Sequence, residues 1–151
     1  MAAYHFSVGH ISRGGGSSAV GSAAYRAGEA LTSEYYGEKY DYTRKGGIVF
    51  SEILLPSHAP PEYADRETLW NAVEKAERRK DAQLAYSFDI ALQNEFTMEE
   101  NKAIVKEYLQ EHFISRGMIA DYQELKSFYT IMSRINDRGV KKAYSKAQEI
   151  E

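Results

Sequence analysis

The chain has 151 residues, of which 43% are apolar and 27% are charged, and its formal net charge is −3. This composition is typical of one globular domain with its own core, and the absence of cysteine excludes disulfides, thiolate catalysis and metal sites with Cys ligands. The slight acidity argues against a protein that coats nucleic acid through charge alone, and the N-terminus lacks the basic and apolar regions of a secretory signal, so we expect a cytoplasmic protein without membrane contact.

The charge is unevenly spread along the chain. Residues 1–50 have a net charge of +1, residues 51–121 have −6, and residues 122–151 have +2. An anionic partner is therefore expected to meet the first third of the chain or the tail, because the acidic middle would repel it.

Apolar periodicity and turn residues predict alternating strands and helices, with Asp65 and the Thr97/Glu100 capping box at two helix starts. The expected elements, in chain order, are a strand over Ala3–Val8, a helix over Ala19–Leu31, a strand or hairpin arm over Glu34–Thr43, a strand over Ile48–Leu55, a helix over Arg66–Lys80, a strand over Leu84–Leu92, a helix over Met98–Ser115, a strand over Met118–Tyr122, and helices over Glu124–Ile135 and on to Glu151. This order predicts an α+β domain in which helices cover a central antiparallel sheet.

Tyr25 is the first candidate for chemistry. It lies in the segment SAAYRAGE, after the basic, glycine-rich turn SRGGGSS of residues 12–18. A phenol with a pKa of about 10 is a weak nucleophile near neutral pH and needs a metal, a base or a cation beside it. Arg13 and Arg26 are candidates to supply positive charge to a phosphate. The alternative is a tyrosine packed between helix and sheet, which the residue alone favours.

Other motifs carry weaker signals. The segment DYTRKGG, which includes Arg44 and Lys45, combines aromatic, hydroxyl and basic groups that suit single-stranded nucleic acid, although an ordinary hairpin tip has a similar composition. The turn SRGGGSS lacks the pattern of a nucleotide-binding P-loop. No two histidines have the spacing of a local metal-ligand pair, so the residues alone predict no metal site.

Three segments read together resemble the N-terminal nuclease domain of the MobA/MobL family of plasmid mobilisation relaxases. They are AYHFSVGHISRGGGSSAVGSAAYRAGE, EYYGEKYDYTRKGGIVFSEILLP and HAPPEYADRETLWNAVEKAE, and a weaker match continues to residue 122. The order and spacing of YH, SRG, YRAGE, DYTRKGG and LWN are specific. We therefore expect a relaxase-like nuclease domain over residues 1–122 and a helical tail over residues 123–151.

The resemblance implies a histidine–hydrophobic–histidine endonuclease fold and a reaction on single-stranded or hairpin DNA at a plasmid transfer origin. A tyrosine hydroxyl attacks one phosphodiester and gives a 5′-phosphotyrosine link and a free 3′-hydroxyl, while a divalent ion, Mg²⁺ or Mn²⁺, on three histidines polarises the phosphate. Carried onto this chain, Tyr25 is the nucleophile, and Arg13, Arg26, Arg44 and Lys45 are phosphate contacts. Accessory mobilisation proteins are further partners that the resemblance allows.

The chain departs from the family after Asp121. Relatives continue through a hairpin with a histidine and a paired H-x-H, whereas residues 122–151 contain no histidine. We therefore expect an incomplete sheet, no ligand set for the ion, and poor nicking by this chain alone.

Three hypotheses stay open at this point. The first is an active relaxase that uses other ligands, such as His5, His10 or His112. The second is a crippled relative that binds origin DNA without cleaving it. The third is a non-enzymatic interaction protein on the same scaffold, whose Ile131–Glu151 tail meets a partner helix. The chemistry favours the second hypothesis, and the family name favours the first.

Overall fold

The computed structural model describes residues 6–15, 17–91, 95–125 and 128–134. Three short 3-10 turns accompany the ten regular elements of this part of the chain. These elements are β1 (Phe6–Ser12), α1 (Ala19–Ala27), β2 (Ala30–Ser33), β3 (Glu38–Asp41), β4 (Phe50–Leu54), α2 (Arg66–Ala76), β5 (Gln83–Ala91), α3 (Met98–His112), β6 (Ile119–Glu124) and β7 (Phe128–Arg134).

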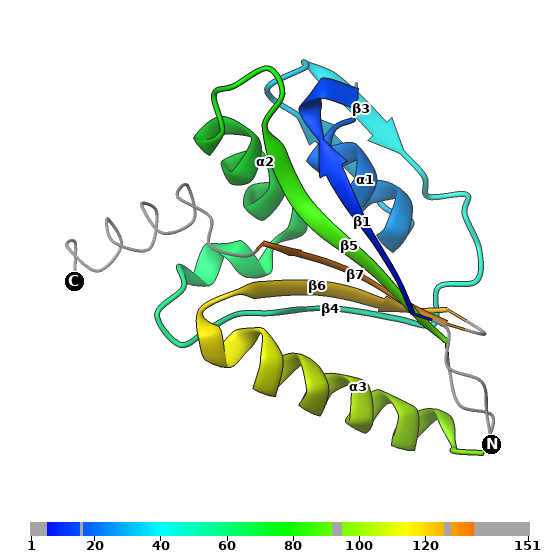
Figure 1. The fold of residues 1–151 in the computed structure, drawn as a ribbon. Helices are drawn as coiled ribbons and strands as arrows, with labels where there is room; N and C mark the ends of the chain where they lie inside the picture. Colours follow the sequence, from blue (N-terminus) through cyan, green and yellow to red (C-terminus); the bar gives the residue numbers. More distant parts are fainter. Residues whose placement is uncertain (1–5, 16, 92–94, 126–127, 135–151) are drawn as a thin grey trace.

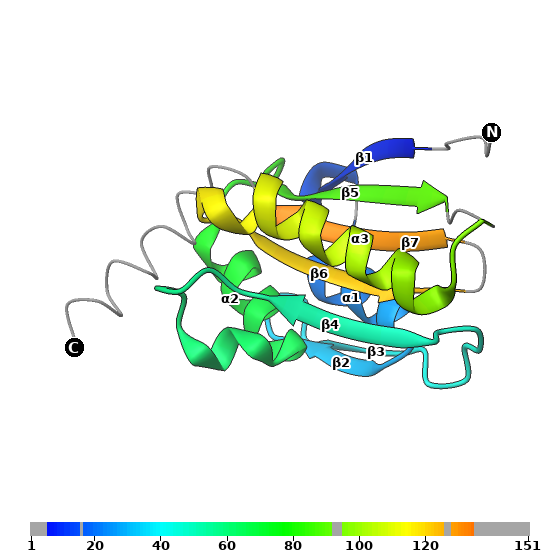
Figure 2. The ribbon, with the colours of Figure 1, turned by 90° about the horizontal axis from the view of Figure 1, so that it is seen from below.

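Five of the strands form one antiparallel sheet in the order β1-β5-β7-β6-β4. Helices α1 and α2 cover one face of this sheet and α3 covers the other face (Figure 1). Viewed from below, α3 runs across the strands of its face (Figure 2). The α+β class with a central antiparallel sheet, predicted from the sequence, is therefore confirmed.

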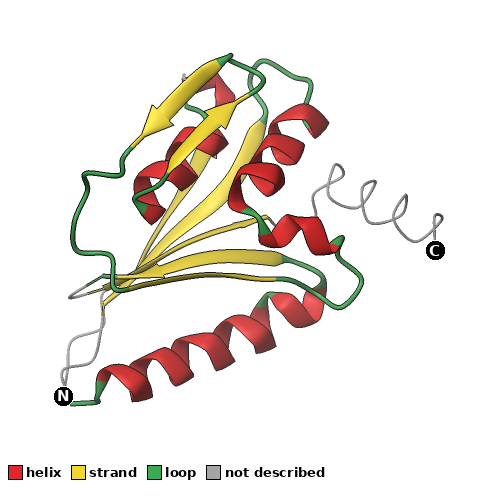
Figure 3. Cartoon of the chain, turned by 180° about the vertical axis from the view of Figure 1, so that it is seen from behind, coloured by secondary structure: helices red, strands yellow, loops and turns green. Residues whose placement is uncertain are grey.

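Strands β2 and β3 form a separate hairpin that contacts α1 outside the main sheet (Figure 3). Helix α1 ends earlier than predicted, at Ala27, because Gly28 adopts a left-handed conformation with φ of 66°. A Cβ at Gly28 would also lie 2.7 Å from Ile48 Cδ1, so any other residue here would require the Ile48 side chain to shift. The chain then turns directly into β2, and the hairpin is held beside the last turn of α1.

Each face of the sheet has its own apolar core. The α1/α2 face buries Trp70 and Leu69 of α2 with Val20 of α1. The α3 face buries Tyr122 and Tyr129 of the sheet with residues of α3. None of the helices in the described ranges is both long and apolar enough to cross a bilayer.

The helix expected over Glu124–Ile135 is wrong. Residues Phe128–Arg134 form β7, which pairs with β5 and β6 at the centre of the sheet. A central strand is covered on both faces, so its apolar residues do not alternate with polar ones and its periodicity does not distinguish a strand from a helix. The sequence predicted an incomplete sheet, because the histidine-bearing hairpin of the relatives is missing. This expectation is wrong, since β7 fills the position between β5 and β6. A boundary after residue 122 would cut β6, and residues 135–151 of the expected tail lie outside the described residues.

Candidate functional site

The N-terminus of α1 is closed by a carboxylate of the protein itself. Ser18 caps the helix by accepting a hydrogen bond from the Gly21 amide at 3.1 Å. The buried Glu74 carboxylate of α2 accepts hydrogen bonds from the Ser18 hydroxyl and, at 3.1 Å, from the Val20 amide. A helix N-terminus is a favourable place for an anion, and Glu74 already fills it. The positive end of α1 is thus neutralised within the protein itself.

Arg13 belongs to the same buried connection. Its guanidinium donates hydrogen bonds to the backbone carbonyl oxygens of Glu74 at 2.6 Å and Arg79 at 3.1 Å, and also to that of Glu77. The side chain is buried, with one face stacked on the ring of Tyr35. The structure does not support the expected phosphate contact of Arg13, because the side chain is buried and its Nη1 and Nη2 groups tie the turn after β1 to the end of α2, while Nε is buried without a partner in the described part of the chain.

Tyr25 lies on the outer side of the last turn of α1. The inward side of this helix consists of small buried residues, including Ala23, Ala24 and Ala27, so the bulky ring is left 53% exposed. The Lys45 ammonium lies 3.8 Å from the centre of the Tyr25 ring and donates a 2.7 Å hydrogen bond to the Tyr25 backbone carbonyl. The alternative of a tyrosine packed between helix and sheet is therefore excluded for Tyr25.

A groove of about 290 Å³ lies between α1 and the β2–β3 hairpin, and Tyr25 is one of its lining residues. Its lining is mostly hydroxyl-bearing: Ser17, Ser18, Gly21, Ser22, Tyr25, Arg26, Tyr40 and Tyr42. Tyr42 meets the Tyr25 ring edge to face, with 5.3 Å between the ring centres. Exposed aromatic faces beside hydroxyls and cations are the groups that bind single-stranded nucleic acid.

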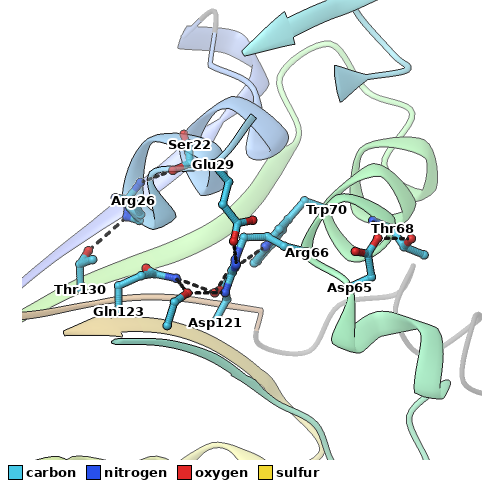
Figure 4. A network of polar contacts seen from close by, with 11 residues as sticks. Ser22, Arg26, Glu29, Asp65, Arg66, Thr68, Trp70, Asp121, Gln123 and Thr130 are labelled. Carbon is cyan, nitrogen blue, oxygen red and sulfur yellow. Dashed lines mark hydrogen bonds and ion pairs between the residues drawn. The ribbon is translucent and has the colours of Figure 1, made fainter. Parts of the chain in front are cut away.

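Arg26 reaches from α1 down to the centre of the sheet. Its Nε donates a 3.2 Å hydrogen bond to the Thr130 hydroxyl of β7, and Nη1 lies 3.5 Å from the Ser22 carbonyl oxygen (Figure 4). Burial lowers the pKa of Arg26, and the more distant carboxylates of Asp89 and Asp121 only partly oppose this effect. Arg26 is thus a half-buried cation whose hydrogen-bond partners among the described residues are all neutral.

Arg44 and Lys45 lie in the turn that follows β3. Arg44 is exposed to solvent, while Lys45 is directed against Tyr25. Burial and then the charge of Arg26 lower the pKa of Lys45. The structure therefore brings Tyr25, Arg26 and Lys45 together, with Arg44 on the nearby surface.

A buried polar network, which the sequence reasoning missed, fixes this region onto the sheet. Asp121 of β6 accepts hydrogen bonds from Arg66 Nε at 2.9 Å, from Trp70 Nε1 at 2.8 Å and from Gln123 Nε2 at 2.7 Å (Figure 4). Arg66 also donates from Nη1 to Glu29, which follows α1 directly, at 2.8 Å. In the sequence Arg66 stands in the polar first turn of a helix, so no local pattern marks it as buried.

The described residues near Tyr25 do not match a site for an ion held by three histidines. Nowhere in the described ranges do three His, Cys, Asp or Glu side chains gather as a metal would require. Two residues of the central strand β7 face α1, and neither is a metal ligand of the expected kind. Thr130 accepts the Arg26 hydrogen bond, and Met132 lies in the core. His10 contacts Gln83 and Tyr86, and His5 lies outside the described residues.

Comparison with known proteins gives the family. The sequence model of the MobA/MobL family matches residues 17–126, which is most of the chain. This chain belongs to the MobA/MobL family. It is 42% identical over 132 residues to "Conjugal transfer protein TraA" of Agrobacterium fabrum, a match that covers 81% of the chain and 12% of that protein.

Two further relatives point in the same direction. "Mobilization protein MobL" of Acidithiobacillus ferridurans is 45% identical over 121 residues, covering 80% of this MobA/MobL chain and 31% of the relative. "Probable mobilization protein MobA" of Bifidobacterium longum is 38% identical over 122 residues, covering 81% and 22%. The chain thus spans less than a third of the length of these curated relatives.

A solved structure described as "Molecular Basis of Vancomycin Resistance Transfer in Staphylococcus aureus" has the same fold as this MobA/MobL chain. The TM-score is 0.82 at 27% sequence identity, and the alignment covers 99% of this chain and 88% of the other.

Proposed function

We propose that this chain is the DNA-processing part of a plasmid mobilisation relaxase, which binds single-stranded DNA at a transfer origin and cleaves it through Tyr25. The relatives named for conjugal transfer and mobilisation support the biological role. The observation that carries the chemical role is the placement of Tyr25, which is exposed and lines a groove together with Arg26, with the Lys45 ammonium over its ring. We expect this activity in the cytoplasm, because its proposed substrate is plasmid DNA.

The proposed reaction is a transesterification. The Tyr25 hydroxyl oxygen attacks the phosphorus of one phosphodiester, a new oxygen–phosphorus bond forms, and the bond from phosphorus to the 3′-oxygen breaks. The phenolic proton is lost to solvent and the leaving 3′-oxygen gains one, so the products are a 5′-phosphotyrosine link and a free 3′-hydroxyl. The reverse reaction rejoins the strand after transfer and needs no external energy source.

The side chains around Tyr25 have defined tasks in this scheme. Lys45 orients the Tyr25 ring through a cation–π contact and supplies positive charge near it. Tyr42 and Tyr40 offer ring surfaces to unstacked bases along the groove. The described residues do not provide the three histidine ligands that the family's Mg²⁺ or Mn²⁺ would need. No step of the reaction is therefore assigned to such an ion.

A second candidate is a protein that binds origin DNA without cleaving it. The neutral residues Thr130 and Met132 on the α1 side of the central strand favour this candidate, since a metal would typically contribute several kcal/mol of charge stabilisation. The expectation of slow nicking, drawn from the histidine-free sequence, stays a prediction.

One experiment separates the two candidates. The full chain is incubated with a supercoiled plasmid that carries the DNA flanking its gene, with Mg²⁺ or Mn²⁺, and products are separated on a denaturing gel. The proposal expects nicked plasmid and a covalent protein–DNA band that Tyr25→Phe abolishes. Tyr108→Phe, which alters an exposed tyrosine on α3, is the matched control and retains both products. DNA binding without a covalent band supports the second candidate, and absence of binding contradicts both.

A further inference from the structure

Arg26 has hydrogen-bond donors that the described residues leave partly unused. It lines the groove next to Tyr25, and its Nε is fixed by the Thr130 hydroxyl. Nη1 has one long contact to the Ser22 carbonyl, and Nη2 has no hydrogen-bond partner among the described residues. A guanidinium presents its N–H donors in a planar fork that matches the oxygens of a phosphate. Nη1 and Nη2 of Arg26 can therefore both donate to one phosphate.

Lys45 supplies a second positive charge beside Tyr25. Its ammonium lies over the Tyr25 ring, and the charge of Arg26 is close enough to lower the pKa of the Lys45 amine. Two partly desolvated cations that disfavour each other are stabilised when an anion lies between them. Their shared neighbour is the ring whose hydroxyl is the proposed nucleophile.

The carboxylates of this region only partly offset the charge of the pair. Asp89 of β5 is the cross-strand neighbour of Thr130 and its charge opposes the lowering of the Arg26 pKa, but it forms neither a hydrogen bond nor an ion pair with Arg26. Asp121 is occupied by Arg66, Trp70 and Gln123, and Glu29 is occupied by Arg66. Glu74 is held at the other end of α1 by Ser18 and Val20. Part of the positive charge beside Tyr25 is therefore left for a ligand, because Asp89 offsets it without pairing with Arg26.

We propose that Arg26 and Lys45 form a site that binds a DNA phosphate without a divalent cation. In this site the Arg26 guanidinium lies between α1, the helix that carries Tyr25, and the central strand β7. This inference rests on the proposed function, because it assumes that the groove binds DNA. Thr130 is a positioning residue: its hydroxyl fixes the direction of the guanidinium and does not itself meet the phosphate.

The test measures binding rather than cleavage. A fluorescent single-stranded oligonucleotide from the DNA flanking the gene is titrated with the full-length Tyr25→Phe chain, which cannot cleave, in EDTA and in Mn²⁺, at several salt concentrations. The expected dissociation constant is the same in EDTA and in Mn²⁺. Arg26→Gln and Lys45→Gln each weaken binding about tenfold or more and lower the slope of log K against log salt by about 0.7.

Matched variants separate this site from general charge effects. Arg26→Lys keeps the charge and retains the salt slope, while Thr130→Val weakens binding and leaves the slope unchanged. Arg116→Gln removes an exposed cation beyond α3 and changes neither quantity. If Arg26→Gln does not fold, as judged by its thermal melt, the Lys45→Gln result decides.

The outcomes distinguish the two proposals. A chain that binds no single-stranded DNA contradicts both the proposed function and this inference. A chain that binds DNA only when Mn²⁺ is present, or whose salt slope is unchanged in both Gln variants, overturns the inference alone. Equal binding in EDTA with a reduced slope in the Gln variants supports it.

Discussion

Replacing Arg66 with methionine tests how the end of α1 is held on the sheet. Arg66 and Asp121 are 9% and 1% exposed, and they form a buried ion pair at 2.9 Å. Arg66→Met leaves the buried Asp121 carboxylate with only its Trp70 and Gln123 donors. Breaking a buried pair from one side costs about 3–5 kcal/mol, and for a domain of this size that lowers Tm by about 6–20 °C.

The assay is a thermal melt followed by circular dichroism, together with urea unfolding of the same samples. Lys75→Met is the matched control, because it removes a cation whose ion pair with Glu34 is exposed (60% and 58%); its expected effect is about 0–1 kcal/mol. A Tm for Arg66→Met within the range of this control would refute the reasoning, because Trp70 and Gln123 would then suffice to stabilise the charge of Asp121. Loss of the Glu29 contact in the same variant is expected to weaken DNA binding as well.

Three further predictions follow from single contacts. Burial, and then a hydrogen bond to a glutamate, raise the pKa of Tyr122. The stability that this shift contributes is therefore complete below about pH 10 and is lost as the pH rises further. In thermal melts at increasing alkaline pH, Tm should fall less for Tyr122→Phe than for the unchanged chain. Gly21→Ala places a Cβ 3.0 Å from the Tyr40 ring and is expected to weaken single-stranded DNA binding several-fold in a titration, whereas Gly46→Ala meets open space and serves as control. Thr97→Ala removes the α3 capping box and is expected to lower the free energy of unfolding in urea by about 0.5–2 kcal/mol without changing DNA binding.

The elements that the sequence predicted best are those with a local cause. The capping box at Thr97 lies within one turn of the helix that it begins, and the structure confirms both of its hydrogen bonds. The alternation over Leu84–Leu92 predicted β5. This strand is second from the edge of the sheet, and polar residues on one of its faces preserve the alternation. In contrast, β7 was predicted as helix, because packing on both of its faces removes that alternation.

The candidate site shows the same division. The sequence by itself determined the family, the polar turn with Lys45, and Tyr25 as the residue to examine, since these depend on residue identity and order along the chain. Only the tertiary structure decided that Arg13 is buried on carbonyl oxygens 61 to 66 positions away, while Arg26 meets Thr130 across 104 positions and lines the groove. Two arginines next to small residues look alike in a sequence, because burial and charge partners are set by segments that meet only when the chain folds.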